Sequence, residues 1–286
     1  MHPQGMTSDS DPIADDGSGS RHAQNGATWS GHDIGQVLRA TYRITELIDE
    51  GGMGRVYAAE HVRLRRKVAV KVLAQHLSSD VSALARFQRE AEIASQLHHP
   101  HVVHILDFDT TESGEPYIVM EFLDGEPLSQ YIDRVGQLPL LRALQVVNQI
   151  AWGLSAAHQA GVVHRDLKPD NVFLLRMQDD SIFVKLLDFG ISKRVEGHRK
   201  VTREFDVLGT PDYMAPEQAM GLTAKVDHRA DQFALAAMSY ELFSGQLPFP
   251  ADSVGEILRK VVSEDPPLLS SFTDVSEEIA HVIQKG

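Results

Sequence analysis

The polar run HRDLKPDN at residues 164–171 constrains this chain more than any other stretch. It brings an aspartate, a lysine and an asparagine together directly after an amphipathic segment at 140–161. The spacing in that segment predicts a long helix with Gly161 as its C-cap. The triplet DFG follows at 188–190, and APE follows at 215–217. The sequence therefore gathers several charged and amide side chains behind one predicted helix.

These residue types suit the transfer of a phosphoryl group. Such a transfer needs an aligned acceptor hydroxyl, metal ions on the phosphate oxygens and neutralisation of charge. Asp166 can accept the hydrogen bond and then the proton of the acceptor, and Lys168 can reach the transferring phosphate. Asn171 and Asp188 offer oxygen atoms, which Mg²⁺ prefers as ligands. The sequence predicts a phosphotransfer site with Asn171 and Asp188 as its metal ligands.

A second signal is the stretch IDEGGMGRVY at residues 48–57, in which three glycines stand close together. Glycine lets backbone N–H groups approach a phosphate because it has no Cβ. The β-type composition on both sides predicts a strand–loop–strand hairpin, unlike the strand–loop–helix of dinucleotide-binding folds. The chain has no G-x-x-x-x-G-K-[ST] motif, which excludes a P-loop. On its own the stretch could also be a plain glycine hairpin.

Two charged residues lie between the glycine-rich stretch and the HRDLKPDN run in the sequence. Lys71 lies in VAVK within a predicted strand at 67–73, and Glu90 lies on a predicted helix at 82–97. A lone lysine–glutamate pair is more often a surface ion pair worth less than about 1 kcal/mol. Its position between the glycine-rich stretch and the HRDLKPDN run favours instead a lysine that is held for the phosphates.

In this order, Lys71, Glu90, HRDLKPDN, DFG and APE resemble the motifs of the eukaryotic-type protein kinase superfamily. Lys168 and the stretch GTPDYMAPEQ at 209–218 are similar to the bacterial Ser/Thr branch. The resemblance covers residues 37–286 and implies an α+β, two-lobed fold. We expect a disordered tail at 1–36, a small and mostly antiparallel β lobe with one main helix at 37–122, and a larger helical lobe at 123–286.

The remaining elements follow from hydrophobic periodicity. Strands are predicted at 102–109 and 116–123, and helices at 229–245, 254–264 and 276–285.

The resemblance also implies catalytic roles. Asp166, Lys168, Lys71 and Glu90 would act at the reacting groups, with Glu90 holding Lys71. Asp231 is similar to the buried helix aspartate that braces the catalytic loop in this family.

The nucleotide site follows from the same resemblance. Backbone groups of Glu121 and Leu123 would face adenine, and Met120 would guard the back pocket. The residues expected to contact ATP are Ile48, Asp49, Glu50, Gly51, Gly52, Met53, Gly54, Val56, Ala69, Lys71, Met120, Glu121, Leu123 and Phe173.

The chain departs from the family pattern in two places. Asp49 stands where the family usually has the first glycine of the loop, at a strand position that tolerates many residues. We expect reduced nucleotide affinity at worst. In the family a late arginine pairs with the APE glutamate, here Glu217, and Arg259 lies too early to do so. We therefore expect that the chain is cut short at its C-terminus.

The composition narrows the functional classes. A net charge of −13 argues against nucleic-acid binding through a basic face, and the absence of cysteine excludes disulfides and thiolate metal sites. The sequence has neither a long apolar span nor a secretory signal, so we expect a cytoplasmic protein. Membrane anchoring through a missing C-terminal part stays open as an alternative. The four histidines of LHHPHVVH at 97–104 could suggest a metal site, but the tract is better interpreted as a helix-to-strand link.

The expected function is ATP-dependent phosphorylation of Ser/Thr hydroxyls in proteins, with Mg²⁺ or alternatively Mn²⁺. The alternatives are a pseudokinase or scaffold, which would not need Lys71, Asp166, Asn171 and Asp188 all intact, and a small-molecule phosphotransferase, which the APE segment disfavours. Self-association for autophosphorylation at Thr202 is expected as well, since a phosphate there could bind Arg165. Thr210 is the weaker candidate, because the resemblance gives it a structural hydrogen bond.

Overall fold

The computed structural model describes residues 34–52, 54–78, 80–178, 181–189, 211–273 and 275–285. Almost all of the predicted tail lies outside these ranges, as do Met53, Thr202 and Thr210. The backbone of Glu90 is described within a helix, but its side chain is not. The roles predicted for these residues therefore stay predictions.

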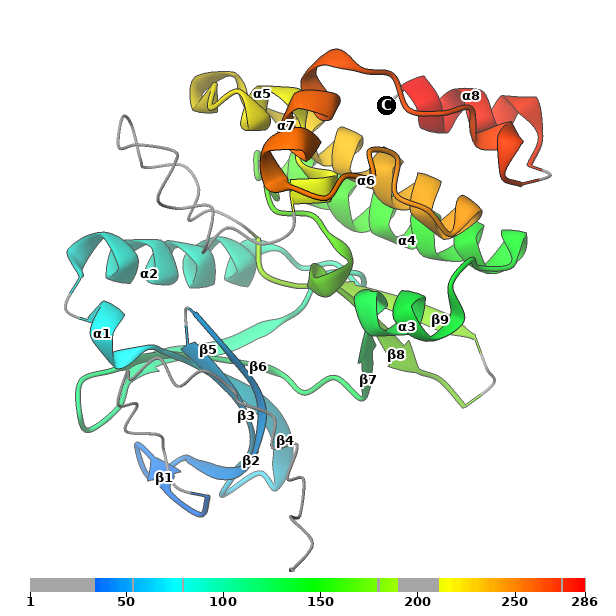
Figure 1. Ribbon diagram of the computed structural model, residues 1–286. Coiled ribbons are helices and arrows are strands. Elements are labelled where there is room, and N and C mark those ends of the chain that lie inside the picture. The colour runs from blue at the N-terminus through cyan, green and yellow to red at the C-terminus, as the bar shows by residue number, and fades with distance from the viewer. Residues whose placement is uncertain are drawn as a thin grey trace, which may run out of the picture. The chain divides into compact units, whose positions relative to one another are not determined.

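The first half of the described chain is built on one antiparallel sheet (Figure 1). Its strands are β1 (Val37–Leu38), β2 (Tyr42–Gly51), β3 (Gly54–His61), β4 (Arg66–Leu73), β5 (Ile105–Thr110) and β6 (Pro116–Glu121), in the order β1-β2-β3-β4-β6-β5. The helices α1 (Gln75–Ser78) and α2 (Val81–Gln96) come between β4 and β5.

Alternation of side chains gives this sheet two apolar faces. Val68 and Val70 of β4 are buried in a cluster on one face. Leu73 and Ile118 belong to a separate cluster with Phe87 of α2, since successive residues of a strand point to opposite faces. The second face is thus the one that α2 covers.

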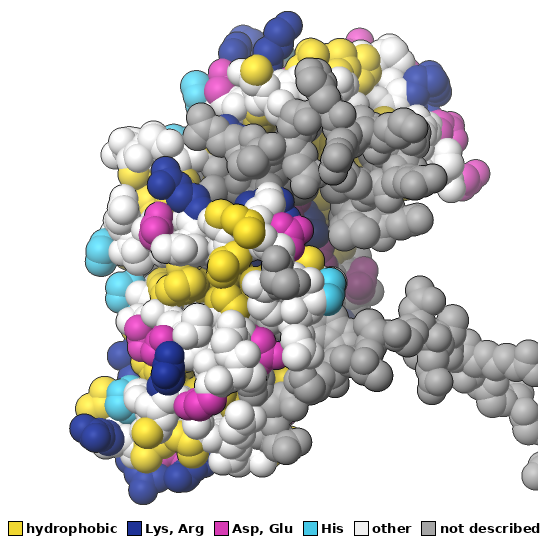
Figure 2. All heavy atoms as spheres, turned by 90° about the vertical axis from the view of Figure 1, so that its left-hand side faces the viewer, with side chains coloured by type: hydrophobic (Ala, Val, Ile, Leu, Met, Phe, Trp, Pro, Cys, Tyr) yellow, Lys and Arg dark blue, Asp and Glu magenta, His cyan; other side chains and the backbone are white. Residues whose placement is uncertain are grey.

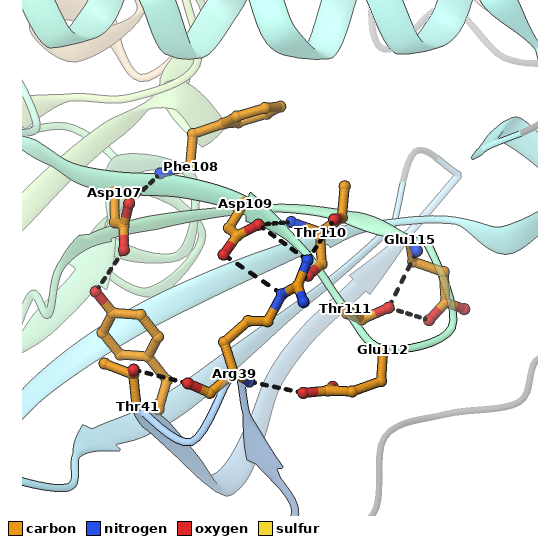
Figure 3. Close-up of polar contacts among 10 residues, drawn as sticks. Arg39, Thr41, Asp107, Phe108, Asp109, Thr110, Thr111, Glu112 and Glu115 are labelled. Atoms are coloured by element: carbon orange, nitrogen blue, oxygen red, sulfur yellow. Dashed lines mark hydrogen bonds and ion pairs between the residues drawn. The ribbon is translucent and has the colours of Figure 1, made fainter.

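The two edge strands of this sheet are linked by side chains (Figure 3). The Arg39 guanidinium, just after β1, donates to the carbonyl oxygen of Thr110 over 2.8 Å and lies 3.5 Å from the Asp109 carboxylate. The Tyr42 hydroxyl donates to Asp107 over 2.9 Å. These contacts join the β1–β2 turn and the start of β2 to β5, which is a neighbour of neither strand in the sheet.

The second half is mainly helical. The long helices α4 (Leu140–Gln159) and α6 (His228–Ser244) pack against each other around buried residues such as Ile150 and Met238. A three-stranded sheet, β7 (Gly125–Pro127), β8 (Val172–Arg176) and β9 (Ile182–Leu186), lies against α4. The other helices are α3 (Leu128–Val135), α5 (Pro216–Ala219), α7 (Val254–Ser263) and α8 (Glu277–Lys285), with 3₁₀ turns at Pro169–Asn171, Pro211–Tyr213, Thr223–Lys225 and Leu269–Ser271.

The structure confirms the α+β class and most of the predicted elements. The five predicted helices correspond to α2, α4, α6, α7 and α8, with small differences at their ends. Gly161 follows α4 with a φ of +74°, the conformation expected of a glycine at a helix end. The predicted lobe boundary at 122–123 falls between β6 and β7 and stays a prediction. Among the described residues, no helix is long and apolar enough to cross a bilayer.

Some sequence predictions were wrong. The strand predicted at 102–109 begins only at Ile105, because the preceding segment lies along β9, where Val102 forms a parallel bridge with Leu186. The short elements α3, β7, β8 and β9 were not predicted, since none has a long periodic pattern.

The histidine tract is part of this packing against β9. His101 is buried, its ring nitrogen lies 2.9 Å from the carbonyl oxygen of Val184, and its ring centroid lies 4.7 Å from that of Phe183. Trp152 of α4 is 58% exposed, and its ring lies beside that of His101.

Candidate active site

The loop that carries HRDLKPDN is held by one buried carboxylate. Asp231, in the first turn of α6, is 1% exposed and accepts the backbone N–H groups of His164 and Arg165 over 2.8 and 2.7 Å. His158 of α4 contacts the same carboxylate at 2.7 Å. Arg165 has a φ of +65°, a strained value for a non-glycine residue. The structure confirms Asp231 as the brace of this loop.

A second set of bonds ties the loop to the segment that ends in Asp188. The amide nitrogen of Asn171 donates to the carbonyl oxygen of Asp166 over 2.7 Å, and the carbonyl oxygen of Asn171 accepts the N–H of Leu187 over 2.9 Å. A ring nitrogen of His164 lies 2.9 Å from the Leu187 carbonyl oxygen. Asp166, Asn171 and Asp188 are thus positioned by one connected network.

The ammonium group of Lys71 lies 2.8 Å from the carboxylate of Asp188. The Lys71 side chain is only 12% exposed, on a strand between β3 and β6, whereas that of Asp188 is 46% exposed. Asp188 has a φ of +43°, and Phe189 after it is buried against the ring of His164. This ion pair joins the β-sheet half of the site to the helical half.

The glycine-rich stretch forms the β2–β3 hairpin, as predicted. In the register Gly51 pairs with Gly54 and Asp49 pairs with Val56. A Cβ on Gly54 would lie 2.0 Å from the carbonyl oxygen of Val72, so only glycine fits there. Asp49 is exposed and its carboxylate accepts the N–H of Glu50 over 2.9 Å. The aspartate therefore lies in β2 before the turn, directly after a register shift between Leu47 and Asp49.

The residues predicted around adenine come from both halves. Ala69 is buried and pairs with Met120 across β4 and β6. Val56, Met120, Glu121, Leu123 and Phe173 are half-buried, whereas Ile48 is 50% exposed.

The side chain of Glu121 has a partner that the sequence did not reveal. Its carboxylate lies 2.6 Å from the ammonium of Lys185 on β9 and accepts the N–H of His104 over 2.8 Å. Both side chains of the ion pair are largely buried. A lysine within the apolar run IFVKLL was the available signal, because lysine is rarely buried without a partner.

Further residues near the loop were also missed. The amide nitrogen of Gln218 donates to the carbonyl oxygen of Arg165 over 2.8 Å, and the Tyr213 hydroxyl donates to the Glu241 carboxylate over 2.5 Å. A cleft beside them is lined by Arg165, Asp166, Leu167, Lys168, Tyr213, Met214, Gln218, Ala230, Asp231 and Ala234.

The APE glutamate, Glu217, is half-buried. The nearby Arg229 pairs with Asp227 at 2.8 Å, and Glu217 adds a smaller contribution that raises the pKa of Arg229. Arg259 pairs with Glu264 at 2.7 Å, so it is engaged elsewhere, as expected.

The Tyr213–Glu241 pair leads to a pH-dependent stability. Burial raises the pKa of the Glu241 carboxyl, and the hydrogen bond from Tyr213 partly opposes this rise. A carboxyl that binds protons more tightly in the folded state loses its stabilising contribution as the pH rises through its folded pKa. The free energy of unfolding should therefore fall as the pH increases from the ordinary value of 4.5 towards the raised pKa.

Urea unfolding at several pH values tests this expectation. Glu241→Gln should flatten the fall, whereas Glu277→Gln, at an exposed site, should leave it unchanged. An unaltered pH slope in Glu241→Gln would contradict the assignment.

Comparison with known proteins identifies the class to which this fold and site belong. The sequence model of one family, described as protein kinase domain, matches residues 42–285. The chain therefore belongs to the protein kinase domain family, as the sequence motifs indicated.

Several proteins that are similar to this chain come from bacteria. The chain is 43% identical over 237 residues to serine/threonine-protein kinase pkn3 of Myxococcus xanthus. The aligned region covers 82% of this chain and 43% of the relative. It is 40% identical over 240 residues to serine/threonine-protein kinase PknA of Mycobacterium tuberculosis, covering 82% of this chain and 54% of the relative. The crystal structure of the M. tuberculosis PknI kinase domain matches with a TM-score of 0.63 at 32% identity, over 88% of this chain and 87% of that one.

Proposed function

We propose that the chain transfers the γ-phosphoryl group of ATP to Ser/Thr hydroxyls of proteins, as a kinase of bacterial signalling. The observation that carries the proposal is the Lys71–Asp188 ion pair, which lies beside a loop held by Asn171 and Asp231. A phosphate-binding cation, a metal-binding carboxylate and a catalytic loop are the parts that this chemistry requires. The kinase names of the relatives support the same reaction.

The side chains fit a magnesium ion. The amide nitrogen of Asn171 is engaged by Asp166, which leaves the amide oxygen as the atom that can bind a metal. Asp188 adds carboxylate oxygens, and hard ions such as Mg²⁺ or Mn²⁺ prefer oxygen ligands. Bound Mg²⁺ would neutralise charge on the phosphate oxygens. We assign this role to Asn171 and Asp188.

The other residues act on the substrates. Asp166 accepts the hydrogen bond and then the proton of the acceptor hydroxyl, so the hydroxyl is aligned and activated. Lys168 stabilises the charge of the phosphoryl group in transfer, and Lys71, held by Glu90, orients the α- and β-phosphates. The β2–β3 hairpin covers the phosphates, and adenine lies between the buried Ala69 and the half-buried Val56 and Phe173.

The competing hypothesis is a scaffold that binds nucleotide or partners without turnover. Incubation of the protein with labelled ATP, Mg²⁺ and a generic Ser/Thr protein substrate separates the two. The wild type should incorporate label, Asp166→Asn should lose it, and Asp252→Asn at an exposed site should keep it. ATP binding without incorporation in the wild type would favour the scaffold.

The aspartate at position 49, where the family usually has glycine, should have little effect on ATP affinity. Because the carboxylate is exposed and bonded to its own neighbour, Asp49→Gly should change ATP affinity by no more than about 1 kcal/mol, or roughly fivefold. Titration of ATP against both proteins measures the change. A hundredfold difference would mean that the carboxylate faces the phosphates.

Autophosphorylation at Thr202 remains part of the proposal, although this residue lies outside the described ranges. A phosphate on Thr202 would add about −1.5 to −2 charges and could bind the arginine that precedes the catalytic aspartate. Mass spectrometry after incubation with ATP should find the modification, and Thr202→Ala should be less active. An unmodified Thr202 in an active preparation would refute this.

A further inference from the structure

The turn between β3 and β4 combines positive charge with an exposed apolar tip. Leu64 is 69% exposed, and the basic residues around it are also exposed; they are Arg63, Arg65, Arg66 and Lys67. We call residues 63–67 the basic turn. In Figure 2, Lys and Arg side chains gather at the lower end of the face shown. This concentration of positive charge stands out in a chain with a net charge of −13.

The basic turn has a defined backbone. The N–H of Arg65 donates to the carbonyl oxygen of His61 over 2.8 Å, and the N–H of Leu64 donates to the His61 ring over 3.3 Å. Arg65 has a φ of +55°, which turns the chain sharply after Leu64. Within the described residues, the ion pair recorded for this turn joins Arg65 to Glu60 at 3.0 Å. Most of the positive charge of the turn is therefore not neutralised by such a pair.

The position of the turn leaves the nucleotide site accessible. It lies at the opposite end of β3 from Gly54, and a strand of this length spans about 25 Å. Lys67 packs over the ring of Phe122, just after β6, at 5.4 Å. An occupant of the basic turn would not cover the glycine hairpin.

The geometry also limits the kind of occupant. β3 and β4 each have a neighbouring strand on both sides, so neither offers a free edge to an added peptide strand. A projecting apolar residue between guanidinium groups suits a soft, flat, anionic surface, where the apolar group enters and the cations bind head groups. Acidic groups elsewhere on the chain act weakly there, because charges are screened beyond about 8 Å at physiological ionic strength.

We propose that the basic turn docks the protein on an anionic phospholipid surface, with Leu64 inserted at the boundary of the head groups. Each basic residue near such a surface strengthens binding by roughly fivefold. The contact is peripheral, reversible and weakened by salt. It does not depend on the phosphotransfer reaction.

Sedimentation of the full chain with vesicles tests the proposal. The protein should bind vesicles that contain phosphatidylserine, bind pure phosphatidylcholine vesicles weakly, and be released by salt. Arg63→Ser and Leu64→Ser should each weaken binding, the arginine change by roughly fivefold. The matched controls Arg142→Ser and Leu141→Ser, at another exposed basic–apolar pair, should bind as the wild type does.

Three results would overturn the proposal. The first is equal binding to neutral and anionic vesicles, and the second is equal binding by the turn variants and the wild type. The third is concentration-dependent self-association without vesicles that is lost in Arg63→Ser, which would assign the turn to a second copy of the chain. Unchanged melting temperatures of the variants would show that the fold is not the cause of any loss.

Discussion

Lys71→Met and Asp188→Asn should each lower kcat by roughly 10³-fold or more while the fold stays intact. The two side chains form an ion pair at 2.8 Å, and both come from elements that meet only in the folded protein. In the proposed reaction they act at the phosphates and the metal, where positioning and charge supply most of the barrier reduction. Phosphate transfer from labelled ATP measures the effect.

Chemically matched controls make this test specific. Lys285→Met and Asp252→Asn carry the same side-chain changes at exposed sites and should keep wild-type rates. Circular dichroism should be the same for all four variants. A near-normal kcat in Lys71→Met or in Asp188→Asn, with an unchanged spectrum, would refute the assignment of the site.

Asp231→Ala should destabilise the protein by about 3–5 kcal/mol, because it removes a buried carboxylate from several partners at once. The N–H groups of His164 and Arg165 would remain buried without their acceptor, and each such loss is costly. Activity should fall as well, since the strained backbone at Arg165 would be free to relax. Urea unfolding and kinetic measurement report the two effects.

Asp227→Ala serves as the comparison on the same helix. Its carboxylate caps α6 by accepting the N–H of Arg229, but its side chain is 41% exposed, so Asp227→Ala should lower the stability much less than Asp231→Ala. Asp231→Asn keeps one acceptor oxygen, so its loss of stability should lie between those of Asp231→Ala and Asp227→Ala. If Asp231→Ala were as stable as Asp227→Ala, the carboxylate would not be the brace that its contacts indicate.

Much of the fold could be predicted from the sequence because the long elements carry a strong period. α2 and α4 repeat apolar residues at helical spacing over several turns, and β4 places a valine at every second position from Val68 to Val72. β8 and β9 are short and lie inside the larger half, where no alternation distinguishes them from loops. The start of β5 was misjudged because the packing of Val102 on β9 overrides its strand-like composition.

The candidate site, like the fold, could be predicted from the sequence only in part. Residue types and order were enough to name Lys71, Asp166, Asn171 and Asp188, because the chemistry of phosphoryl transfer demands those groups. Their partners were not all predictable. Nothing local in the sequence links Glu121 to Lys185 or Tyr213 to Glu241.

The sequence by itself determined the class of the fold, the long helices and strands, and which side chains are candidates for the site. The tertiary structure decided that Lys71 meets Asp188, that Asp231 holds the loop, that Asp49 lies exposed and that Trp152 lies outside the core. The physical reason is the range of the interactions. Periodicity and turn chemistry act over a few residues, whereas these contacts join residues far apart in the chain and depend on strand register and helix packing.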